Sequence, residues 1–338
     1  MTVARDRVFD HTLEQHRPEL TGYCYRMLAS PFEAEDAVQE TMLRAWRGMD
    51  EFERRASLRT WLYRIATNVC IDMAEARERR AMPMDLGPAR EPVFANLATP
   101  EVPWVEPLPD ALVAFAASPD PEAVAIRNES VRLAMVTAMQ RLPARQRATL
   151  LLREVIGLSA AEVAALLETS EASINSALQR ARATIDASPT AFDRASARAT
   201  ASVDQAQLDR FVAAFERYDV DELTGMLRDD ALQSMPPYDL WLDSRDDVLA
   251  WWFGPGAACR GSRLLPAGSA NGIPAYGQYK PAEDGDGYEP WSLNVFELDA
   301  DGLLANATFF LEHERLFPLF GLPVRLDATG QPVVTQSA

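Results

Sequence analysis

The chain has 338 residues, of which 48% are hydrophobic and 25% charged, and its formal net charge is −17. This length exceeds one ordinary domain, and the composition is typical of a soluble globular protein of two or three domains. No apolar run approaches the ~18 to 20 residues of a membrane span and the N-terminus lacks an apolar signal-peptide core, so we expect a cytoplasmic protein.

The acidity is unevenly distributed. Residues 81–124 carry one Arg against seven acidic residues, and residues 188–338 carry 11 basic against 23 acidic residues. Residues 1–80 and 125–187 are close to neutral, with net charges of −1 and +2. A chain that is acidic overall can therefore still present two basic surfaces to nucleic acid.

The first predicted elements are two amphipathic helices between residues 34 and 80. Apolar side chains recur at helical spacing in both. In the first helix they are Val38, Met42, Ala45 and Trp46, and in the second they are Leu58, Trp61, Leu62, Ile65 and Val69. Ser57 is placed to cap the second helix.

The next segment, residues 81–121, is rich in proline and shows no sustained period. This pattern indicates an acidic linker with at most short helical turns. Its stretch EVPWVEPLPDAL contains a tryptophan that an acidic spacer does not require.

Residues 122–187 are predicted to be helical and to contain a helix-turn-helix. Ser159 and Glu162 form a capping box that starts a short helix through Leu167, after Gly157 ends the preceding one. A second helix follows the turn at residues 168–170, with Ile174, Leu178, Ala181 and Ile185 facing inward. Two such helices suit reading of the DNA major groove, although a plain helical hairpin has the same pattern.

The remaining residues are predicted to form a connector (188–202), an α+β domain (203–326) and a tail (327–338). The domain opens with an amphipathic helix, continues with the helical WLDSRDDVLAWWF, and ends with the strand-like runs SLNVFEL and ATFFLEH separated by DADG. The three cysteines are odd in number and lack metal-ligand spacing, so neither a disulfide framework, a metal site nor a cofactor is expected.

Two of these segments resemble bacterial sigma factors of the extracytoplasmic-function (ECF) group. EAEDAVQETMLRAWRGMDEFERRASLRTWLYRIATNVCIDMAEARERR resembles region 2, and LPARQRATLLLREVIGLSAAEVAALLETSEASINSALQRARATI resembles region 4. The resemblance implies two all-α domains that bind the clamp and flap of core RNA polymerase and the minus-10 and minus-35 promoter elements. We expect a transcription initiation factor that is not an enzyme.

The resemblance assigns candidate residues in region 2. The polymerase-binding candidates are Asp36, Gln39, Glu40 and Arg44. The minus-10 candidates are Phe52, Arg54, Arg55, Tyr63, Arg64, Asn68, Arg77, Arg79 and Arg80. Unstacking a base costs a few kcal/mol that aromatic and polar contacts must recover, whereas the arginines suit phosphates. Trp61 shares the apolar stripe and is expected to pack in the core.

In region 4 the predicted minus-35 contacts are Ser173, Asn175, Ser176, Gln179, Arg180 and Arg182. Asn and Gln can pair with adenine, and Arg with guanine. Many relatives carry cations where Asn175 and Ala177 stand. Fewer phosphate contacts predict weak binding to DNA by residues 122–187 alone.

Residues 203–326 resemble the SnoaL-like, ketosteroid-isomerase-like α+β cone, a domain that is fused to a subgroup of ECF factors as a built-in regulator. The pocket candidates are Tyr238, Asp239, Trp241, Trp252, Tyr276 and His313. No acid/base pair has a spacing that implies a reaction, so we expect sensing of a small ligand or protein contact rather than catalysis.

The resemblance also suggests a role for the linker between regions 2 and 4. An acidic, proline-rich chain is suited to thread a basic polymerase channel. We predict that Trp104, Pro107 and Leu108 dock on the C-terminal domain. Two other classes of function stay open here: a helix-turn-helix regulator without polymerase, and an isomerase or cyclase with a DNA-binding appendage.

Overall fold

The computed structural model describes residues 12–49, 57–113, 121–187, 189–199 and 205–333. The chain divides into two compact units, a helical unit of Met1–Ala81 with Val105–Ser188 and a C-terminal unit of Met82–Trp104 with Pro189–Ala338. The predicted linker is thus shared between the two units. Met82–Trp104 fold with the C-terminal unit, and residues 105–113 fold with the helical unit. None of the described helices is long and apolar enough to cross a membrane.

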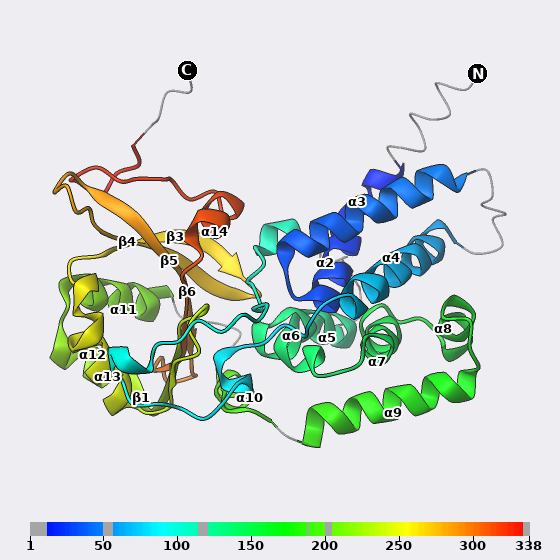
Figure 1. Ribbon diagram of the computed structural model, residues 1–338, viewed down its shortest axis with the longest axis horizontal. Helices are drawn as coiled ribbons and strands as arrows, with labels where there is room; N and C mark the ends of the chain where they lie inside the picture. Colours follow the sequence, from blue (N-terminus) through cyan, green and yellow to red (C-terminus); the bar gives the residue numbers. More distant parts are fainter. Residues whose placement is uncertain (1–11, 50–56, 114–120, 188, 200–204, 334–338) are drawn as a thin grey trace. The chain divides into compact units, whose positions relative to one another are not determined.

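The first half of the helical unit is a three-helix bundle (Figure 1). Its helices are α2 (Arg17–Leu28), α3 (Pro31–Arg47) and α4 (Leu58–Glu75), and all three pack on one another. Ser30 and Ser57 cap α3 and α4 by accepting hydrogen bonds from backbone amides. Trp46, which we predicted on the buried face of α3, is 53% exposed. It lies about 80° around the helix from Val38, because each residue turns a helix by about 100°.

The second half of the helical unit contains the predicted helix-turn-helix. Its elements are α5 (Pro121–Val131), α6 (Leu133–Gln140), α7 (Ala144–Leu150), the π-helical turn η5 (Leu151–Val155), α8 (Ala160–Leu166) and α9 (Glu171–Ala187). The capping box forms, since Ser159 Oγ accepts from the Glu162 amide at 3.2 Å and Glu162 Oε2 accepts from the Ser159 amide at 2.7 Å. Ile174, Leu178 and Ala181 are buried, as their spacing predicted.

The C-terminal unit is a curved six-stranded sheet with helices packed on it. Its helices are α10 (Ala191–Ser196), α11 (Gln205–Arg217), α12 (Val220–Met226), α13 (Arg245–Phe253) and α14 (His313–Leu319), with the 3-10 turn η6 (Pro255–Cys259). Its strands are β1 (Leu227–Ser234), β2 (Trp241–Leu242), β3 (Arg263–Ala270), β4 (Ile273–Pro281), β5 (Tyr288–Leu298) and β6 (Leu304–Phe310). The prediction of an α+β fold is confirmed.

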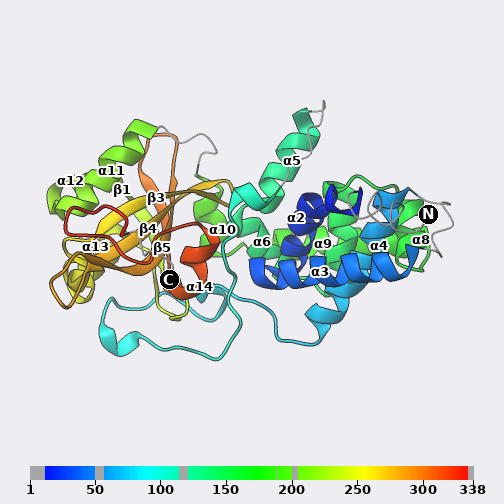
Figure 2. The ribbon, with the colours of Figure 1, turned by 90° about the horizontal axis from the view of Figure 1, so that it is seen from above.

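The sheet has the order β2-β1-β6-β5-β4-β3, in which β1 and β6 are parallel and the other neighbours antiparallel. Figures 1 and 2 show α11, α12 and α13 gathered against it. The core between them contains Phe211 of α11, Trp252 of α13, Phe296 of β5 and Phe309 of β6. Large aromatic side chains therefore make up much of this core.

Over residues 81–113, the part of the linker that the structure describes, the helical elements are the short 3-10 turns η2 (Pro83–Asp85), η3 (Phe94–Asn96) and η4 (Asp110–Leu112). Prolines and the lack of an apolar period prevent longer helices.

Candidate functional site

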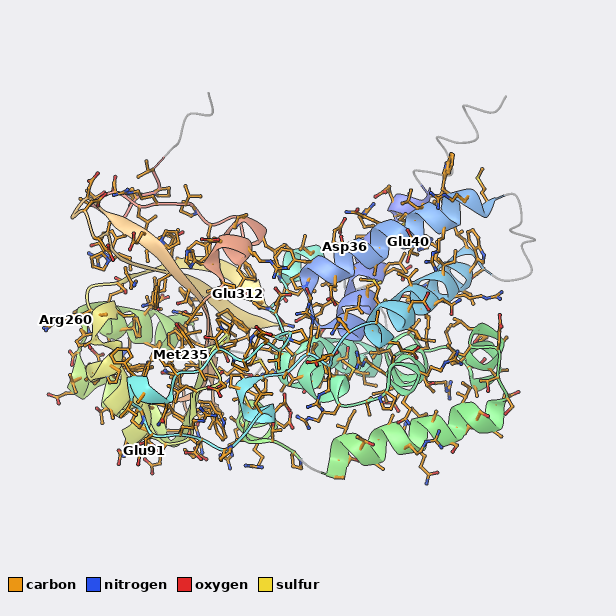
Figure 3. All side chains as sticks on the ribbon, viewed as in Figure 1. Asp36, Glu40, Glu91, Met235, Arg260 and Glu312 are labelled. Atoms are coloured by element: carbon orange, nitrogen blue, oxygen red, sulfur yellow. The ribbon has the colours of Figure 1, made fainter. Side chains whose placement is uncertain are left out.

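Helix α3 presents a polar strip with two large apolar side chains at its end. Asp36 and Gln39 are exposed and Glu40 is half-buried, and Glu40 accepts from Arg44 Nε at 2.7 Å. Figure 3 labels Asp36 and Glu40 on this helix. Leu43 and Trp46, which we did not predict here, continue the strip and are 49% and 53% exposed.

The spacing 36, 39/40, 43, 46 was visible in the sequence, and it places all these residues on one helix face. An exposed tryptophan beside an exposed leucine is typical of a surface that binds another protein.

Helix α4 exposes part of the predicted minus-10 set. Arg64 and Asn68 are exposed one turn apart, and Arg64 pairs with Glu168 at 2.7 Å. Tyr63 is 1% exposed, its ring packs edge-on against Tyr23 at 5.2 Å, and burial raises its pKa. A buried ring is not available to a base, so the structure corrects the assignment of Tyr63 to DNA. Phe52, Arg54 and Arg55 lie outside the described residues.

The three arginines after α4 differ in their surroundings. Arg79 is exposed, whereas Arg77 and Arg80 hold the two oxygens of Glu33 at 2.7 and 2.9 Å. Burial lowers the pKa of Arg77. Among these arginines, only Arg79 is therefore free in the described structure to meet a phosphate without first losing an ion pair.

The linker supplies a further partner to this cluster. Glu106 is 3% exposed, and its Oε2 lies 3.3 Å from Arg80 Nη1. Its backbone amide donates to Ala29 at 3.0 Å, and its carbonyl accepts from Tyr25 Oη at 2.9 Å. A linker carboxylate thus occupies an arginine that we assigned to DNA phosphates.

Helix α9 exposes the predicted minus-35 residues. Ser173, Asn175, Ser176, Gln179, Arg180 and Arg182 are all exposed. Arg180 donates to Ser176 one turn earlier, and Ser173 shares a hydrogen bond with Ser170 at 2.9 Å. Arg182 donates through Nε to Glu154 at 2.6 Å, so this cation is held against η5. Asn175, Ser176, Gln179 and Arg180 form two i, i+4 pairs and are brought together on one surface.

A groove of about 520 Å³ lies beside α9 in the helical unit. Its apolar lining includes Ile126, Met135, Leu151 and Ile185, and Glu129, Glu154 and Asp186 stand among the polar residues. No periodic pattern in the sequence indicated this groove, because it forms where α5, α6, η5 and α9 meet.

The first part of the linker binds the C-terminal unit. Arg90, the one basic residue of residues 81–124, pairs with Asp239 at 2.7 Å, and its amide donates to Trp241 O at 3.1 Å. Trp241 Nε1 donates to Gly87 O at 2.9 Å. The Phe94 ring lies edge-on to Trp251 at 5.8 Å. We call residues 87–98 the strap.

The three predicted docking residues belong to different units. Trp104 is 6% exposed and belongs to the C-terminal unit, but Pro107 and Leu108 are buried in the helical unit. The prediction that all three dock on the C-terminal domain is corrected for Pro107 and Leu108, because the backbone from Val105 onward bonds to Ala81 and Ala29.

The C-terminal unit contains an aromatic cavity of about 50 Å³. Its lining comprises Phe215, Tyr218, Gln233, Met235, Trp251, Trp252, Gly256, Cys259, Gln278, Trp291, Phe309 and Leu311. Trp252 is the predicted pocket residue that lines it. Figure 3 labels Met235 inside this unit.

The other predicted pocket residues lie elsewhere. Tyr276 packs in the core 6.0 Å from Phe296, and Trp241 bonds to the strap. His313 begins α14, with Nδ1 3.2 Å from Leu311 O, and Tyr238 is half-buried. None of these four is among the residues described as lining the cavity. No cluster of His, Cys, Asp and Glu suited to a metal occurs in the described residues.

Two segments of the helical unit match known protein families. Residues 12–80 match the family model "Sigma-70 region 2", and residues 132–185 match "Sigma-70, region 4". Over 316 residues the chain is 43% identical to the ECF RNA polymerase sigma factor SigG of Mycobacterium tuberculosis, covering 93% of this chain and 83% of SigG.

Two further similar proteins come from the same organism. The sigma factor SigM is 31% identical over 184 residues, 54% of this chain and 77% of SigM. The crystal structure of the extracytoplasmic function sigma factor SigJ aligns over 94% of this chain and 99% of SigJ, with a TM-score of 0.56 and 22% identity. The SigJ likeness concerns the fold.

Proposed function

Because this chain belongs to the ECF group of RNA polymerase sigma factors, we propose that its C-terminal domain regulates transcription initiation by controlling the linker between regions 2 and 4. The chain is a promoter-specificity factor that directs transcription initiation. Sigma factors of this family bind core RNA polymerase and promoter DNA. This membership removes the alternative of a regulator that acts without polymerase. A factor that works with polymerase acts in the cytoplasm.

We assign polymerase binding in region 2 to the outer strip of α3. Asp36, Gln39 and Glu40 supply polar contacts, and Leu43 and Trp46 supply apolar area that water contacts in the free chain. In region 4, the groove beside α9 is the candidate for the polymerase flap, since its apolar lining suits a protein segment.

Promoter contacts are assigned to the exposed polar side chains of α4 and α9. Arg64, Asn68 and Arg79 are proposed for the minus-10 element, and Asn175, Ser176, Gln179 and Arg180 for the minus-35 element. Their exposure supports this assignment. Arg77 joins the minus-10 set only if it leaves Glu33, and Arg80 only if it leaves both Glu33 and the linker carboxylate of Glu106.

One observation carries the regulatory proposal: the described part of the linker is bound at two places. The strap bonds to Asp239 and Trp241 within the C-terminal unit, and Glu106 is buried beside Arg80 within the helical unit. A linker that threads the polymerase channel must give up such contacts. The strap therefore restrains the linker, and its release favours initiation.

We propose that the C-terminal domain does not catalyse a reaction. Asp, Glu, His, Lys and Arg are absent from the cavity lining among the described residues. Its titratable members are Tyr218 and Cys259, and burial raises the pKa of both. General acid–base catalysis at neutral pH is most efficient with a group whose pKa lies near that pH. A test for turnover of steroid- and polyketide-like substrates is expected to give none.

The regulatory proposal is tested by in vitro transcription with core polymerase. We expect promoter-dependent initiation from the full chain, and more from a truncation after residue 187. Arg90→Gln, which removes the ion pair to Asp239, is expected to raise initiation part of the way, by about two- to fivefold. The matched control is Arg260→Gln, an exposed cation of the same unit outside the strap.

If neither the full chain nor the truncation supported promoter-dependent initiation, the proposal that this chain directs initiation would be contradicted. Equal activity of the full chain, the truncation and Arg90→Gln would contradict only the regulatory part. Lower activity of the truncation would mean that the domain assists initiation.

A further inference from the structure

Arg182 is a cation of α9 that an ion pair holds against η5. Its Nε donates to Glu154 Oε1 at 2.6 Å, and its Nη2 pairs with the same oxygen. Glu154 lies in η5, the element that precedes the helix-turn-helix. The pair therefore joins the proposed DNA-reading helix to a different part of region 4.

Arg182 stands on the same side of α9 as the proposed base-reading residues. It follows Asn175 by seven residues, and each residue turns a helix by about 100°, so the two side chains start within about 20° of one another. The buried stripe of Ile174, Leu178 and Ala181 faces the other way. Without its ion pair, the Arg182 guanidinium would stand at the end of the reading face, a place that suits a DNA phosphate.

The ion pair is easily exchanged. The side chains of Arg182 and Glu154 remain 61% and 30% exposed, so water screens their attraction. A pair of this kind changes an equilibrium constant by about fivefold at most. Glu154 therefore sets the resting position of Arg182, and another cation that pairs with Glu154 releases it.

Both members of the pair line the groove of about 520 Å³ beside α9. Among the described residues of this lining, Glu129, Glu154 and Asp186 are carboxylates and Arg182 is the one cation. Asp186 lies in the last turn of α9, where the carbonyls at the helix end add negative potential. An apolar groove with this charge fits an apolar segment that also carries a lysine or an arginine.

We propose that Glu154 is a positioning residue that couples the two binding surfaces of region 4. In the free chain it holds Arg182 against η5. When the polymerase segment fills the groove, a lysine or arginine of that segment pairs with Glu154, and Arg182 turns to a phosphate of the minus-35 DNA. This inference rests on the proposed roles of α9 and of the groove, and it adds the chemistry of the partner segment.

The coupling is reciprocal. DNA that takes Arg182 frees Glu154 for the polymerase segment, so each partner strengthens the binding of the other by the same factor. The free chain is thereby kept from binding promoters tightly before it has joined polymerase.

The first measurement is the salt dependence of DNA binding by the free full chain. The probe is a labelled duplex of a promoter at which the chain initiates with core polymerase. One added phosphate contact steepens the plot of log affinity against log salt by about 0.9. Glu154→Gln is expected to give this change and a two- to fivefold higher affinity, about the strength of the lost pair. Arg182→Gln is expected to leave the slope unchanged by itself and to abolish the gain from Glu154→Gln.

In the holoenzyme, which is core polymerase with this chain bound, the groove is filled and the expectation reverses. Arg182→Gln is expected to reduce the slope by about 0.9, with and without Glu154→Gln. The control Glu171→Gln removes an exposed carboxylate from the first turn of α9, about 16 Å along the helix from Arg182. Its effect is expected to be the same whether or not Arg182 is present.

Three results would overturn the proposal: a free-chain slope that Glu154→Gln leaves unchanged, a gain from Glu154→Gln that survives together with Arg182→Gln, or a holoenzyme slope that Arg182→Gln leaves unchanged. A shallower slope of the free chain with Arg182→Gln alone would also overturn it, because Glu154 would then not withhold the cation. If the free chain shows no measurable binding, the holoenzyme measurement decides.

The proposed role of α9 is tested separately by Arg180→Gln. If this change leaves promoter binding by the holoenzyme unaltered, α9 is not the reading helix, and the failure lies in the proposed function. If it weakens promoter binding while the variants of Glu154 and Arg182 behave as the unmodified chain, only the coupling fails.

Discussion

Arg147 of α7 is a buried cation whose partners, in the described part of the chain, are neutral oxygens. It is 5% exposed and donates to the carbonyls of Met139 at 2.9 Å and Leu142 at 3.1 Å, to both oxygens of Gln140, and to Met27 O. Met27 lies at the end of α2, and Gln140 at the end of α6. Carbonyls at helix C-termini are unpaired and carry partial negative charge, so one guanidinium satisfies both ends.

Burial lowers the pKa of Arg147 to about 10, so the side chain remains charged at neutral pH. Its charge carries a desolvation cost, and a neutral replacement would remove that cost. The same replacement would leave several buried carbonyls without donors, at about 1 to 3 kcal/mol each. The second effect is larger because the arginine serves several acceptors.

We therefore predict that Arg147→Met lowers the free energy of unfolding by at least about 2 kcal/mol, measured by urea denaturation of the full chain. Arg145→Met, at an exposed position of the same helix, is the control and should change it little. Unchanged or increased stability of Arg147→Met would mean that desolvation of the cation outweighs its hydrogen bonds.

At the scale of elements, α3 illustrates how a period can predict a helix and misplace one residue. The spacing of Val38, Met42 and Ala45 predicted the buried face correctly. Trp46 fits the same spacing loosely, but it lies at the end of the helix beside exposed Leu43. Burial depends on what packs opposite a residue, which a sequence period does not contain.

The position of Trp46 leads to a prediction about polymerase binding. Truncation of a tryptophan at a protein interface is often costly, so Trp46→Ala should weaken binding to core polymerase about tenfold or more. The measurement is an equilibrium binding titration with immobilised core polymerase. Val324→Ala, at a 62% exposed apolar residue of the C-terminal unit, is the control. Equal affinities of the two variants would remove α3 from the interface.

The sequence patterns predicted helices α8 and α9 most accurately. The capping box at Ser159 and Glu162 and the inward stripe of α9 are interactions between residues three or four apart. Such short-range features can be predicted from the sequence alone. The exposure of Gln179 and Arg180 followed from the same stripe.

At the scale of the whole molecule, the linker is the element whose role changed most. Its composition suggested an extended acidic spacer, yet residues 87–98 bind the C-terminal unit and Glu106 is buried in the helical unit. The carboxylate of Glu106 pairs with Arg80 in the free chain, and a basic polymerase channel would also attract it. The same carboxylate can serve both states in turn, because each offers it a positive environment.

Glu106→Gln is predicted to loosen the linker, since it removes the charge that faces Arg80 and keeps the shape of the side chain. We expect limited proteolysis near residues 104–113 to become at least about threefold faster and initiation in vitro to rise. Glu101→Gln, at an exposed position of the same linker, is the control. No difference between the variants in either measurement would show that Glu106 does not hold the linker.

The sequence alone determined the two sigma regions, the helix-turn-helix with its exposed face, and the α+β character of the C-terminal domain, because these depend on local periods, caps and motif spacing. The tertiary structure decided that Tyr63 is buried, that Arg77 and Arg80 are paired, and that the indole of Trp252 donates to Gln233. It also decided that Arg90 and Glu106 anchor the linker. These pairings join residues 19 to 149 positions apart or set a side chain against a distant core, and no local pattern encodes such contacts.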